Sequence, residues 1–411
     1  MKLYLILLIA TSFITSHSHA MNSSSSMREE EEKTIRQKVE RVHLKDEIEE
    51  DDFEEWRQNV ATLDEPWVQT LLHKVTSKDI TTLDMSRNNI GMAGAWVIAE
   101  FLRLRESNLT SLNMSSNNIG DAGATAIANV LHRSKLASLD IGFNNIGVVG
   151  ATAIANVLPQ SKLTSLNMNS NNTRPSGAKV IANVLPQSKL TSLDIRDNNI
   201  GDVGATAIAN VLPQSKLTSL DIRDNKIGAT GAKTIADFLP QSKLTSLDMS
   251  CNDIGDAGAT VIANVLPQSN FISLDMSSNS IGDAGVTAIA NVLPQSNLIS
   301  LDMSSNSIGD TGATAIANVL PQSKLASLNI RDNKIGATGA KTIADFLPQS
   351  NLTSLNMSSN NIGDAGATAI ANVLPQSKLT FLNMRSNKLG VVGKETLEEV
   401  RQKANHTDFA F

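Results

Sequence analysis

The feature that most constrains this chain of 411 residues is a repeat 27 residues long. A short pattern, in most copies Ser-Leu-Asp/Asn-Met/Ile, recurs at this spacing, and an earlier copy with Leu83 lies 29 residues upstream of the first regular one. A fixed period of this length predicts a stacked array of similar repeats rather than one globular core. The leucines of the regular copies are Leu112, Leu139, Leu166, Leu193, Leu220, Leu247, Leu274, Leu301, Leu328, Leu355 and Leu382.

Within one repeat the spacing of apolar residues changes. Leu112 and Met114 alternate with polar residues, which is typical of a short strand. From Ala124 to Leu131 the apolar residues fall at i, i+3, i+4 and i+7, which predicts one face of an α-helix. A strand followed by a helix in every repeat predicts a parallel sheet.

Charged and special residues mark the ends of the predicted helices. Proline follows the last apolar leucine in nine repeats, from Pro159 to Pro375, and is expected to end the helix. A glycine at the helix start, present in all twelve repeats from Gly94 to Gly393, is expected to let the helix approach the strand layer closely. In six repeats an aspartate stands just ahead of the helical stripe, placed to cap free N–H groups. The six are Asp121, Asp202, Asp256, Asp283, Asp310 and Asp364.

An asparagine stands five residues after the patterned leucine in every repeat. Its amide has two donors and one acceptor, enough to satisfy backbone groups of its own turn and of the neighbouring turn. We therefore interpret these residues as a structural ladder and not as a site. They are Asn88, Asn117, Asn144, Asn171, Asn198, Asn225, Asn252, Asn279, Asn306, Asn333, Asn360 and Asn387.

Packing distances predict that the array is curved. Adjacent strands lie about 4.8 Å apart, whereas packed helices need about 8 to 10 Å, so the strands must form the inner wall. Twelve strands give a wall on the order of 55 Å long. The predicted fold class is an α/β solenoid, a right-handed horseshoe with parallel strands on the concave face and helices on the convex face.

The repeated pattern Leu-x-x-Leu-x-Met/Ile-x-x-Asn-x-Ile-Gly-x-x-Gly-Ala covers about residues 80–400. It resembles the leucine-rich repeats of the ribonuclease-inhibitor type, which are similar to those of Ran GTPase-activating protein and of the sensor ends of NOD-like receptors. The resemblance implies a horseshoe whose usual task is to recognise a partner. Two features depart from the type: the period is slightly short, and Asn172-Thr173-Arg174-Pro175 stands where Ile-Gly is expected.

The segments outside the repeats have different compositions. Lys2, an apolar run and Ser18-His19-Ala20 predict a cleaved signal peptide, so the expected location is secreted or extracytoplasmic. If this segment is instead a buried strand or helix, the alternative location is the cytoplasm. The predicted segments are a signal peptide (1–20), a disordered linker (21–30), a helical N-terminal cap (31–79), the leucine-rich repeats (80–393), and a C-terminal cap helix with a tail (394–411).

The sequence contains no motif that predicts catalysis or a bound cofactor. Gly-x-x-x-x-Gly-Lys-Ser/Thr, Gly-x-Ser-x-Gly and His-Glu-x-x-His are all missing. Cys251 is the single cysteine, and the six histidines lack the spacing of a helical metal site. The net charge of -6 argues against a nucleic-acid partner, and no later stretch has the roughly 20 apolar residues of a membrane span. We predict a monomer without enzymatic activity, cofactor or metal.

The best candidate for a binding surface is the wall formed by the outward-facing strand residues. One column of these residues is acidic in its middle, the next contains arginines, and Phe143 lies one position further on. Arginine and aromatic residues contribute most to interface energy. Arg196 and Arg223 have a second interpretation, since they are also placed to neutralise the acidic column. The candidate contact residues are Phe143, Asp194, Arg196, Asp221, Arg223, Asp248, Asp275, Asp302, Arg331 and Arg385.

The leading hypothesis is therefore a secreted, non-catalytic module whose concave face binds a protein. One alternative is a GTPase-activating regulator, in which Arg174 or Arg87 enters a partner's active site. Another is a recognition module of a sensor or receptor. Residues 222–242 and 330–350 are identical, which indicates recent duplication and a wall that is young, of modest affinity or suited to a repetitive ligand.

Overall fold

The computed structural model describes residues 57–411 except 59, 62, 64, 77–78, 105–106 and 405–407. The predicted signal peptide, the linker and residues 31–56 of the predicted N-terminal cap lie outside the described residues. The chain divides into two compact units, an N-terminal unit of residues 1–164 and a C-terminal unit of residues 165–411.

The N-terminal unit contains one helix, α4, followed by three repeats of strand and helix. Helix α4 buries Trp67, Val68 and Leu71. The three strands pair in parallel, with Leu112 opposite both Leu83 and Leu139. The elements are α4 (Pro66–Lys74), β1 (Thr82–Asp84), α5 (Gly91–Arg103), β2 (Ser111–Asn113), α6 (Gly120–Leu131), β3 (Ser138–Asp140), α7 (Val148–Val157) and the 3₁₀ turn η1 (Leu158–Gln160).

The C-terminal unit contains nine repeats of strand and helix and one further strand. The strands are β4 (Ser165–Asn167), β5 (Ser192–Asp194), β6 (Ser219–Asp221), β7 (Ser246–Asp248), β8 (Ser273–Asp275), β9 (Ser300–Asp302), β10 (Ser327–Asn329), β11 (Ser354–Asn356), β12 (Phe381–Asn383) and β13 (Phe409–Ala410). The helices are α8 (Arg174–Val184), α9 (Gly201–Ala209), α10 (Ala229–Phe238), α11 (Gly255–Val265), α12 (Asp283–Val292), α13 (Asp310–Val319), α14 (Ala337–Phe346), α15 (Gly363–Val373) and α16 (Val391–Ala404).

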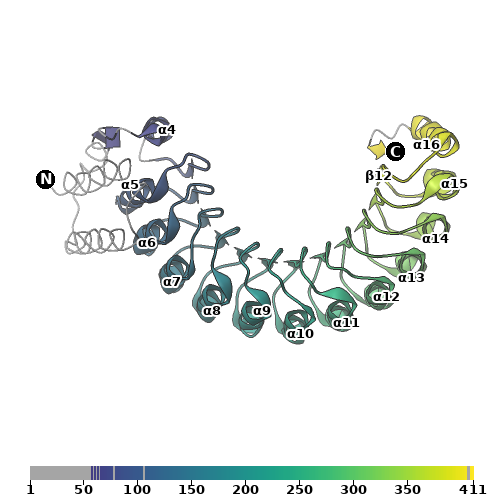
Figure 1. The fold of residues 1–411 in the computed structure, drawn as a ribbon, viewed down its shortest axis with the longest axis horizontal. Coiled ribbons are helices and arrows are strands. Elements are labelled where there is room, and N and C mark those ends of the chain that lie inside the picture. Colours follow the sequence, from purple (N-terminus) through teal and green to yellow (C-terminus); the bar gives the residue numbers. More distant parts are fainter. Residues whose placement is uncertain are drawn as a thin grey trace, which may run out of the picture. The chain divides into compact units, whose positions relative to one another are not determined.

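The strands of the C-terminal unit follow one another in chain order, and each pairs in parallel with the next. Leu220, Leu247 and Leu274 are in register, as the 27-residue period predicts. Figure 1 shows that in this unit the strands line the inner side of an arc and the helices α8 to α16 lie on its outer side. The predicted α/β solenoid with strands and helices on opposite faces is confirmed.

The core consists of the same apolar positions in each repeat. In the repeat of β6, Leu217, Leu220, Ile222 and Ile227 are all at most 1% exposed. Phe271 takes the position of Leu217 two repeats later and is equally buried. Each leucine packs between its counterparts in the adjacent repeats, so the repeats stabilise one another and none has a complete core alone.

The conserved spacing of proline produces a 3₁₀ turn instead of a simple helix end. Helix α10 stops one residue before Leu239, and Leu239-Pro240-Gln241 forms the turn η4. The ring of proline suits this position because the first turn of a helix leaves its N–H groups unbonded. The hydroxyl of Ser242 then donates to the Leu239 carbonyl over 2.8 Å and closes the turn. The other turns are η2 (Leu185–Gln187), η3 (Leu212–Gln214), η5 (Leu266–Gln268), η6 (Leu293–Gln295), η7 (Leu320–Gln322), η8 (Leu347–Gln349) and η9 (Leu374–Gln376).

The aspartates at the helix starts cap the helix of the following repeat and not their own. The Oδ1 atom of Asp202 accepts the N–H groups of Gly228 (2.8 Å) and Gly231 (3.0 Å), whereas helix α9, which contains Asp202, has no side-chain cap. The reason is position, because an aspartate in the first turn of its own helix projects along the stacking direction. The other five aspartates make the same pair of bonds.

The glycine before each helix adopts one of two backbone conformations according to this cap. Gly228 follows a repeat with an aspartate and is extended, with φ -93°. Gly255 follows a repeat that has Ala229 at the aspartate position, and it is left-handed, with φ +60°. Its N–H then donates to the carbonyl of Asn279 at 3.0 Å. Only the left-handed form requires glycine on conformational grounds.

Arg174 occupies the left-handed form of this position, with φ 57°. We expect Arg174→Gly to raise the free energy of unfolding by about 0.5–1 kcal/mol, because relief of the left-handed strain exceeds the entropy that glycine adds to the unfolded chain. Urea denaturation measures the change, and Gly255→Ala is the control, with a loss of similar size expected. A neutral or destabilising Arg174→Gly would show that the arginine side chain makes compensating contacts.

The second glycine of each repeat is needed for packing between helices. A Cβ on Gly285 would lie 2.8 Å from Ile281 Cγ2 of its own loop and 3.0 Å from Ala259 Cβ of the preceding helix. The expectation that this glycine faces the strand layer is therefore wrong. The neighbouring helix is what comes too close.

Strand β13 adds a partial thirteenth repeat in the segment predicted as a tail. Phe409 lies opposite Leu382 in the sheet and is 2% exposed. It stands 27 residues after Leu382, and Phe411 follows at the spacing of the next core position. The two rings are 6.4 Å apart in an edge-to-face arrangement. The repeat period therefore contained the signal for this strand.

Candidate binding surface

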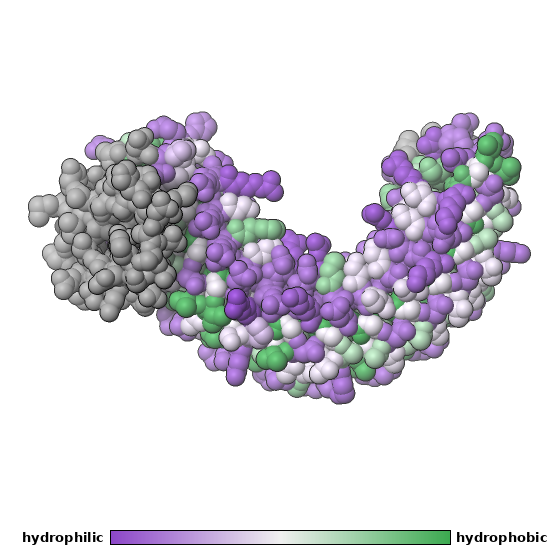
Figure 2. Space-filling view, viewed as in Figure 1, coloured by the Kyte–Doolittle hydropathy of each residue, from purple (hydrophilic) through white to green (hydrophobic). Residues whose placement is uncertain are grey.

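The inner wall of the C-terminal unit is the candidate site. We define it as the outward-facing residues of β4 to β12 together with the residue two positions after each strand. The core leucines point away from it, so it consists mainly of serine, aspartate, asparagine and arginine. Figure 2 shows hydrophilic residues gathered along the inner side of this unit.

Five aspartates form a continuous acidic column on this wall. Register places Asp194, Asp221, Asp248, Asp275 and Asp302 side by side at the ends of β5 to β9. Neighbouring strands lie about 4.8 Å apart, so the carboxylates repel one another. Each Oδ1 accepts the N–H two residues further on, at 2.8 to 3.1 Å. One oxygen of each carboxylate thus closes its own turn, and the other is left for contacts along the wall.

Burial raises the pKa of two carboxyls in this column. The pKa of Asp275 rises to about 6, mainly because burial disfavours its charge, with further contributions from Asp248 and Asp302. The hydrogen bond from the Ser277 backbone opposes this rise. The pKa of Asp221 also rises to about 6, again mainly through burial. The middle of the wall therefore gains protons just below neutral pH.

This rise predicts a pH-dependent stability. Because the pKa of Asp221 and Asp275 is about 6 in the folded state against 3.8 ordinarily, the folded state binds more protons between about pH 4 and 6. The free energy of unfolding contributed by these groups therefore falls as the pH rises through this window. We expect Asp221→Asn or Asp275→Asn to add about 1–2 kcal/mol at pH 7, after allowance for solvent screening, and almost nothing at pH 4.

Urea denaturation across this pH range checks the prediction. Asn retains the Oδ1 acceptor, so the turn is preserved in both variants. Asp345→Asn on the outer helix α14 is the control and is expected to change the profile little, since Asp345 is exposed. A variant as pH-dependent as the wild type would contradict the assignment.

The four arginines of the wall differ in their partners. Arg196 lies between two aspartates, with Nε 3.5 Å from Asp194 Oδ2 and Nη1 3.7 Å from Asp221 Oδ2. It therefore neutralises one end of the acidic column. Within the described part of the chain, Arg223, Arg331 and Arg385 are exposed and have no ion-pair partner. These three guanidinium groups are available to a ligand.

The remaining predicted residues lie on turns. Phe143, in the N-terminal unit, follows β3 and is 56% exposed in the left-handed conformation, with φ 54°. Arg87 in the N-terminal unit and Arg174 in the C-terminal unit are exposed turn residues with φ 57°. None of the three is on a strand. The structure brings together Asp194, Arg196 and Asp221 in direct contact, and the other wall residues follow in separate repeats.

Two exposed isoleucines at the edge of the wall were missed by sequence reasoning. Ile272 and Ile299 directly precede β8 and β9 and are 46% and 45% exposed. Most repeats have threonine or alanine at this position. That local departure was the available signal, but the periodicity alone does not show whether a residue just before a short strand is exposed.

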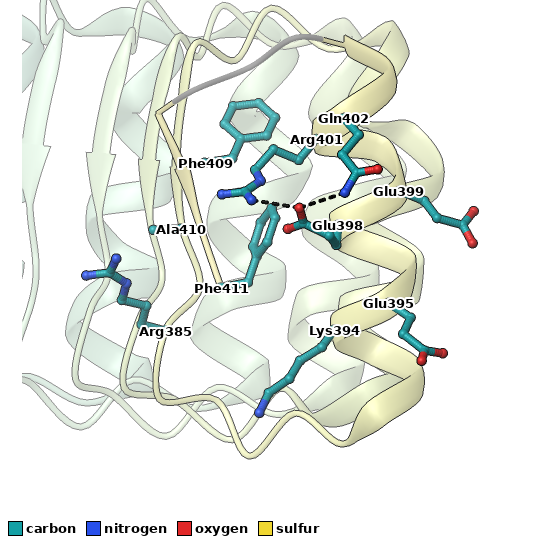
Figure 3. A pocket seen from close by; sticks show the side chains of 10 residues that line it. All are labelled: Arg385, Lys394, Glu395, Glu398, Glu399, Arg401, Gln402, Phe409, Ala410 and Phe411. Atoms are coloured by element: carbon teal, nitrogen blue, oxygen red, sulfur yellow. Dashed lines mark hydrogen bonds and ion pairs between the residues drawn. The ribbon is translucent and has the colours of Figure 1, made fainter.

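A second cavity, of about 580 Å³, lies between helix α16 and strand β13 (Figure 3). Its charged groups are paired, because Glu398 accepts hydrogen bonds from Arg401 at 2.7 Å and from Gln402 at 3.1 Å. The bond from Arg401, followed by that from Gln402, lowers the pKa of Glu398. This arrangement stabilises the end of the solenoid and leaves little for ligand chemistry.

Two further searches cover only the residues that the structure describes. In these residues no group of three or more His, Cys, Asp or Glu side chains is arranged to hold a metal ion. None of their helices combines the length and the apolar character that crossing a membrane requires.

Sequence comparison with protein families agrees with the repeat geometry. The family described as "Leucine Rich repeat" matches ten segments that together cover more than half of the chain. The chain therefore belongs to the leucine-rich repeat family. The irregular repeat around Arg174 is not among the matched segments, which are 76–99, 106–128, 132–155, 187–209, 214–236, 241–263, 269–290, 295–317, 322–344 and 349–371.

Solved structures show the same fold at low sequence identity. An internalin from Listeria monocytogenes is 22% identical with a TM-score of 0.50, over 82% of this chain and 97% of the internalin chain. A structure of the Rad7 and Elc1 complex in yeast is 16% identical with a TM-score of 0.47, over 70% of this chain and 71% of that chain. No curated protein matches the chain in sequence.

Proposed function

We propose that this protein is a non-catalytic scaffold of the ribonuclease-inhibitor type that acts as a monomer and binds a protein partner through the inner wall of its C-terminal unit. Leucine-rich repeat proteins serve as protein-interaction scaffolds, which supports the general role. The observation that carries the proposal is the unpaired charge on the wall. Arg223, Arg331 and Arg385 are exposed beside carboxylates that each retain a free oxygen. Such groups bind a complementary surface without first breaking an internal ion pair.

The repeats themselves supply a test that preserves the fold. Ser250, Ser277, Ser304 and Ser358 stand at the position of the three arginines in other repeats, so Arg223→Ser, Arg331→Ser and Arg385→Ser introduce a residue that the wall already accepts. The full chain carrying all three substitutions is immobilised beside the wild type and exposed to extract and medium of the source cells. The captured proteins are quantified by mass spectrometry.

A matched control removes three positive charges from the outer helices. Lys179, Lys233 and Lys341 are exposed on α8, α10 and α14, and their replacement by alanine leaves the wall intact. We expect a captured protein to be lost from the arginine variant and kept by the lysine variant. Equal capture by all three proteins, or no capture at all, would overturn the proposal.

The alternative function is a GTPase-activating regulator. Arg174 supports it because this side chain is exposed on the turn before α8 and, among the described residues, has no ion-pair partner. Such a role requires GTP hydrolysis by a small GTPase to accelerate with the wild type and not with Arg174→Ala or Arg87→Ala. Unchanged hydrolysis with the wild type would exclude it.

We further propose that residues 1–20 direct secretion and are removed. The charged start, apolar centre and small residues before Met21 support this location. N-terminal sequencing of the mature protein from fractionated cells is expected to begin after Ala20. Protein that retains Met1 and stays in the cytoplasm would contradict the proposal.

A further inference from the structure

A shallow groove of about 770 Å³ lies along the edge of the inner wall across β7 to β10. Its apolar floor consists of Ile272, Ile299 and Ala326, together with Thr245. Ile272 and Ile299 sit on adjacent repeats and are nearly half exposed. Adjacent exposed apolar side chains on a repeat array with otherwise polar edges mark a contact surface.

The outer border of the groove is positively charged at its two ends. Lys243 lies at one end and Lys324 at the other, and both are exposed. Between them, Asn270 and Asn297 stand where these flanking repeats have lysine. Asn297 accepts a hydrogen bond from Lys324 Nζ at 2.7 Å, and Asn270 donates to the Ser242 carbonyl at 3.2 Å. The asparagines leave the isoleucines free of flanking positive charge.

The inner border of the groove is negatively charged. Three residues after each floor residue, strands β7 to β9 present Asp248, Asp275 and Asp302. The surface therefore has three parallel bands: lysines at the corners outside, isoleucines in the middle, and aspartates inside. An occupant with complementary charge has an apolar stripe with acidic residues on one flank and basic residues on the other.

The backbone beneath the groove is already hydrogen-bonded. The N–H of Ile272 donates to Thr245, that of Ile299 to Ile272, and that of Ala326 to Ile299, each at 2.8 to 2.9 Å. An extended peptide would bury its own N–H and C=O groups without backbone partners here. A helix satisfies those groups internally. Its side chains at i, i+3 or i+4, and i+7 repeat every 4.5 to 6 Å, which suits strands about 4.8 Å apart.

We propose that this groove binds an amphipathic helix of the protein partner. The apolar stripe of the helix packs on Ile272, Ile299 and Ala326, its acidic flank faces Lys243 and Lys324, and its basic flank faces the aspartates. The inference rests on the proposed function, because it names the kind of segment that the inner wall recognises.

The test uses a synthetic 18-residue helical peptide with leucines at i, i+4 and i+7, glutamates on one flank and arginines on the other. Its binding to the full-length protein is measured by fluorescence anisotropy. Ile272→Thr with Ile299→Thr installs the residue that neighbouring repeats have, so the fold is retained. We expect this variant to bind about tenfold more weakly, because two buried isoleucine contacts are lost.

Matched controls separate the groove from general stickiness. Val203→Thr with Val391→Thr removes two exposed valines from the outer helices and is expected to leave binding unchanged. A peptide of the same composition with its leucines spread around the helix is expected to bind at least tenfold more weakly. Equal binding by the isoleucine variant, equal binding of the rearranged peptide, or no binding of the designed peptide would each overturn the inference.

The capture experiment distinguishes this inference from the proposed function. A partner that is lost with the arginine variant and kept by the isoleucine variant leaves the proposed function standing and overturns the helix groove. A partner lost with both variants supports both.

Discussion

Replacing Asn225 by alanine is expected to lower the free energy of unfolding by about 3–5 kcal/mol. Its Oδ1 accepts the N–H groups of Asn198 at 3.0 Å and Ile200 at 3.3 Å. Its Nδ2 donates to the carbonyls of Ile195 and Ile222 at 3.0 and 3.1 Å, and also to that of Arg223. The side chain is fully buried, so alanine leaves several backbone groups of two repeats without a partner.

Urea denaturation measures this loss, and hydrogen exchange locates it. The amides of Asn198 and Ile200 are expected to exchange much faster in Asn225→Ala, because their acceptor is gone. Asn210→Ala, at an exposed helix end, is the control and is expected to change stability by less than about 0.5 kcal/mol. A loss below 1 kcal/mol for Asn225→Ala, with unchanged exchange, would show that water replaces the amide.

Replacing Asp256 by alanine is expected to cost about 1.5–3 kcal/mol. Its Oδ1 accepts the N–H groups of Gly282 at 2.7 Å and Gly285 at 2.9 Å in the next repeat, and both bonds are charge-assisted. The loss is limited because Gly282 has an alternative. Without the aspartate we expect Gly282 to leave its extended conformation, with φ -99°, for the left-handed form that Gly255 adopts at +60°.

The conformational change gives this prediction a second measurement. The amide resonance of Gly282 is expected to shift in Asp256→Ala, in addition to the lower urea midpoint. In this background Gly282→Ala should be costlier than in the wild type, because the left-handed form penalises a Cβ. Asp237→Ala, which removes an exposed carboxylate paired only with Lys233, is the control. An unshifted Gly282 resonance would show that the cap does not select the conformation.

The strands and core helices were predictable because each depends on spacing within one repeat. Leu220, Ile222 and Ile235 are buried wherever the period places them, and register follows because a displacement would remove every leucine from the core at once. The same period also pointed to Phe409. The candidate wall followed in the same way, since residues that alternate with buried leucines must face outward.

What depends on contact between repeats was not predictable from one repeat. The sequence by itself determined the solenoid, its buried positions and the column of aspartates, because these follow from periodicity. Only the tertiary structure decided that Asp256 caps the following helix, that burial shifts the pKa of Asp275, and that Ile272 and Ile299 form the floor of a groove. The physical reason is distance, because each of these properties depends on atoms that only the stacking of one repeat on the next brings within a few ångströms.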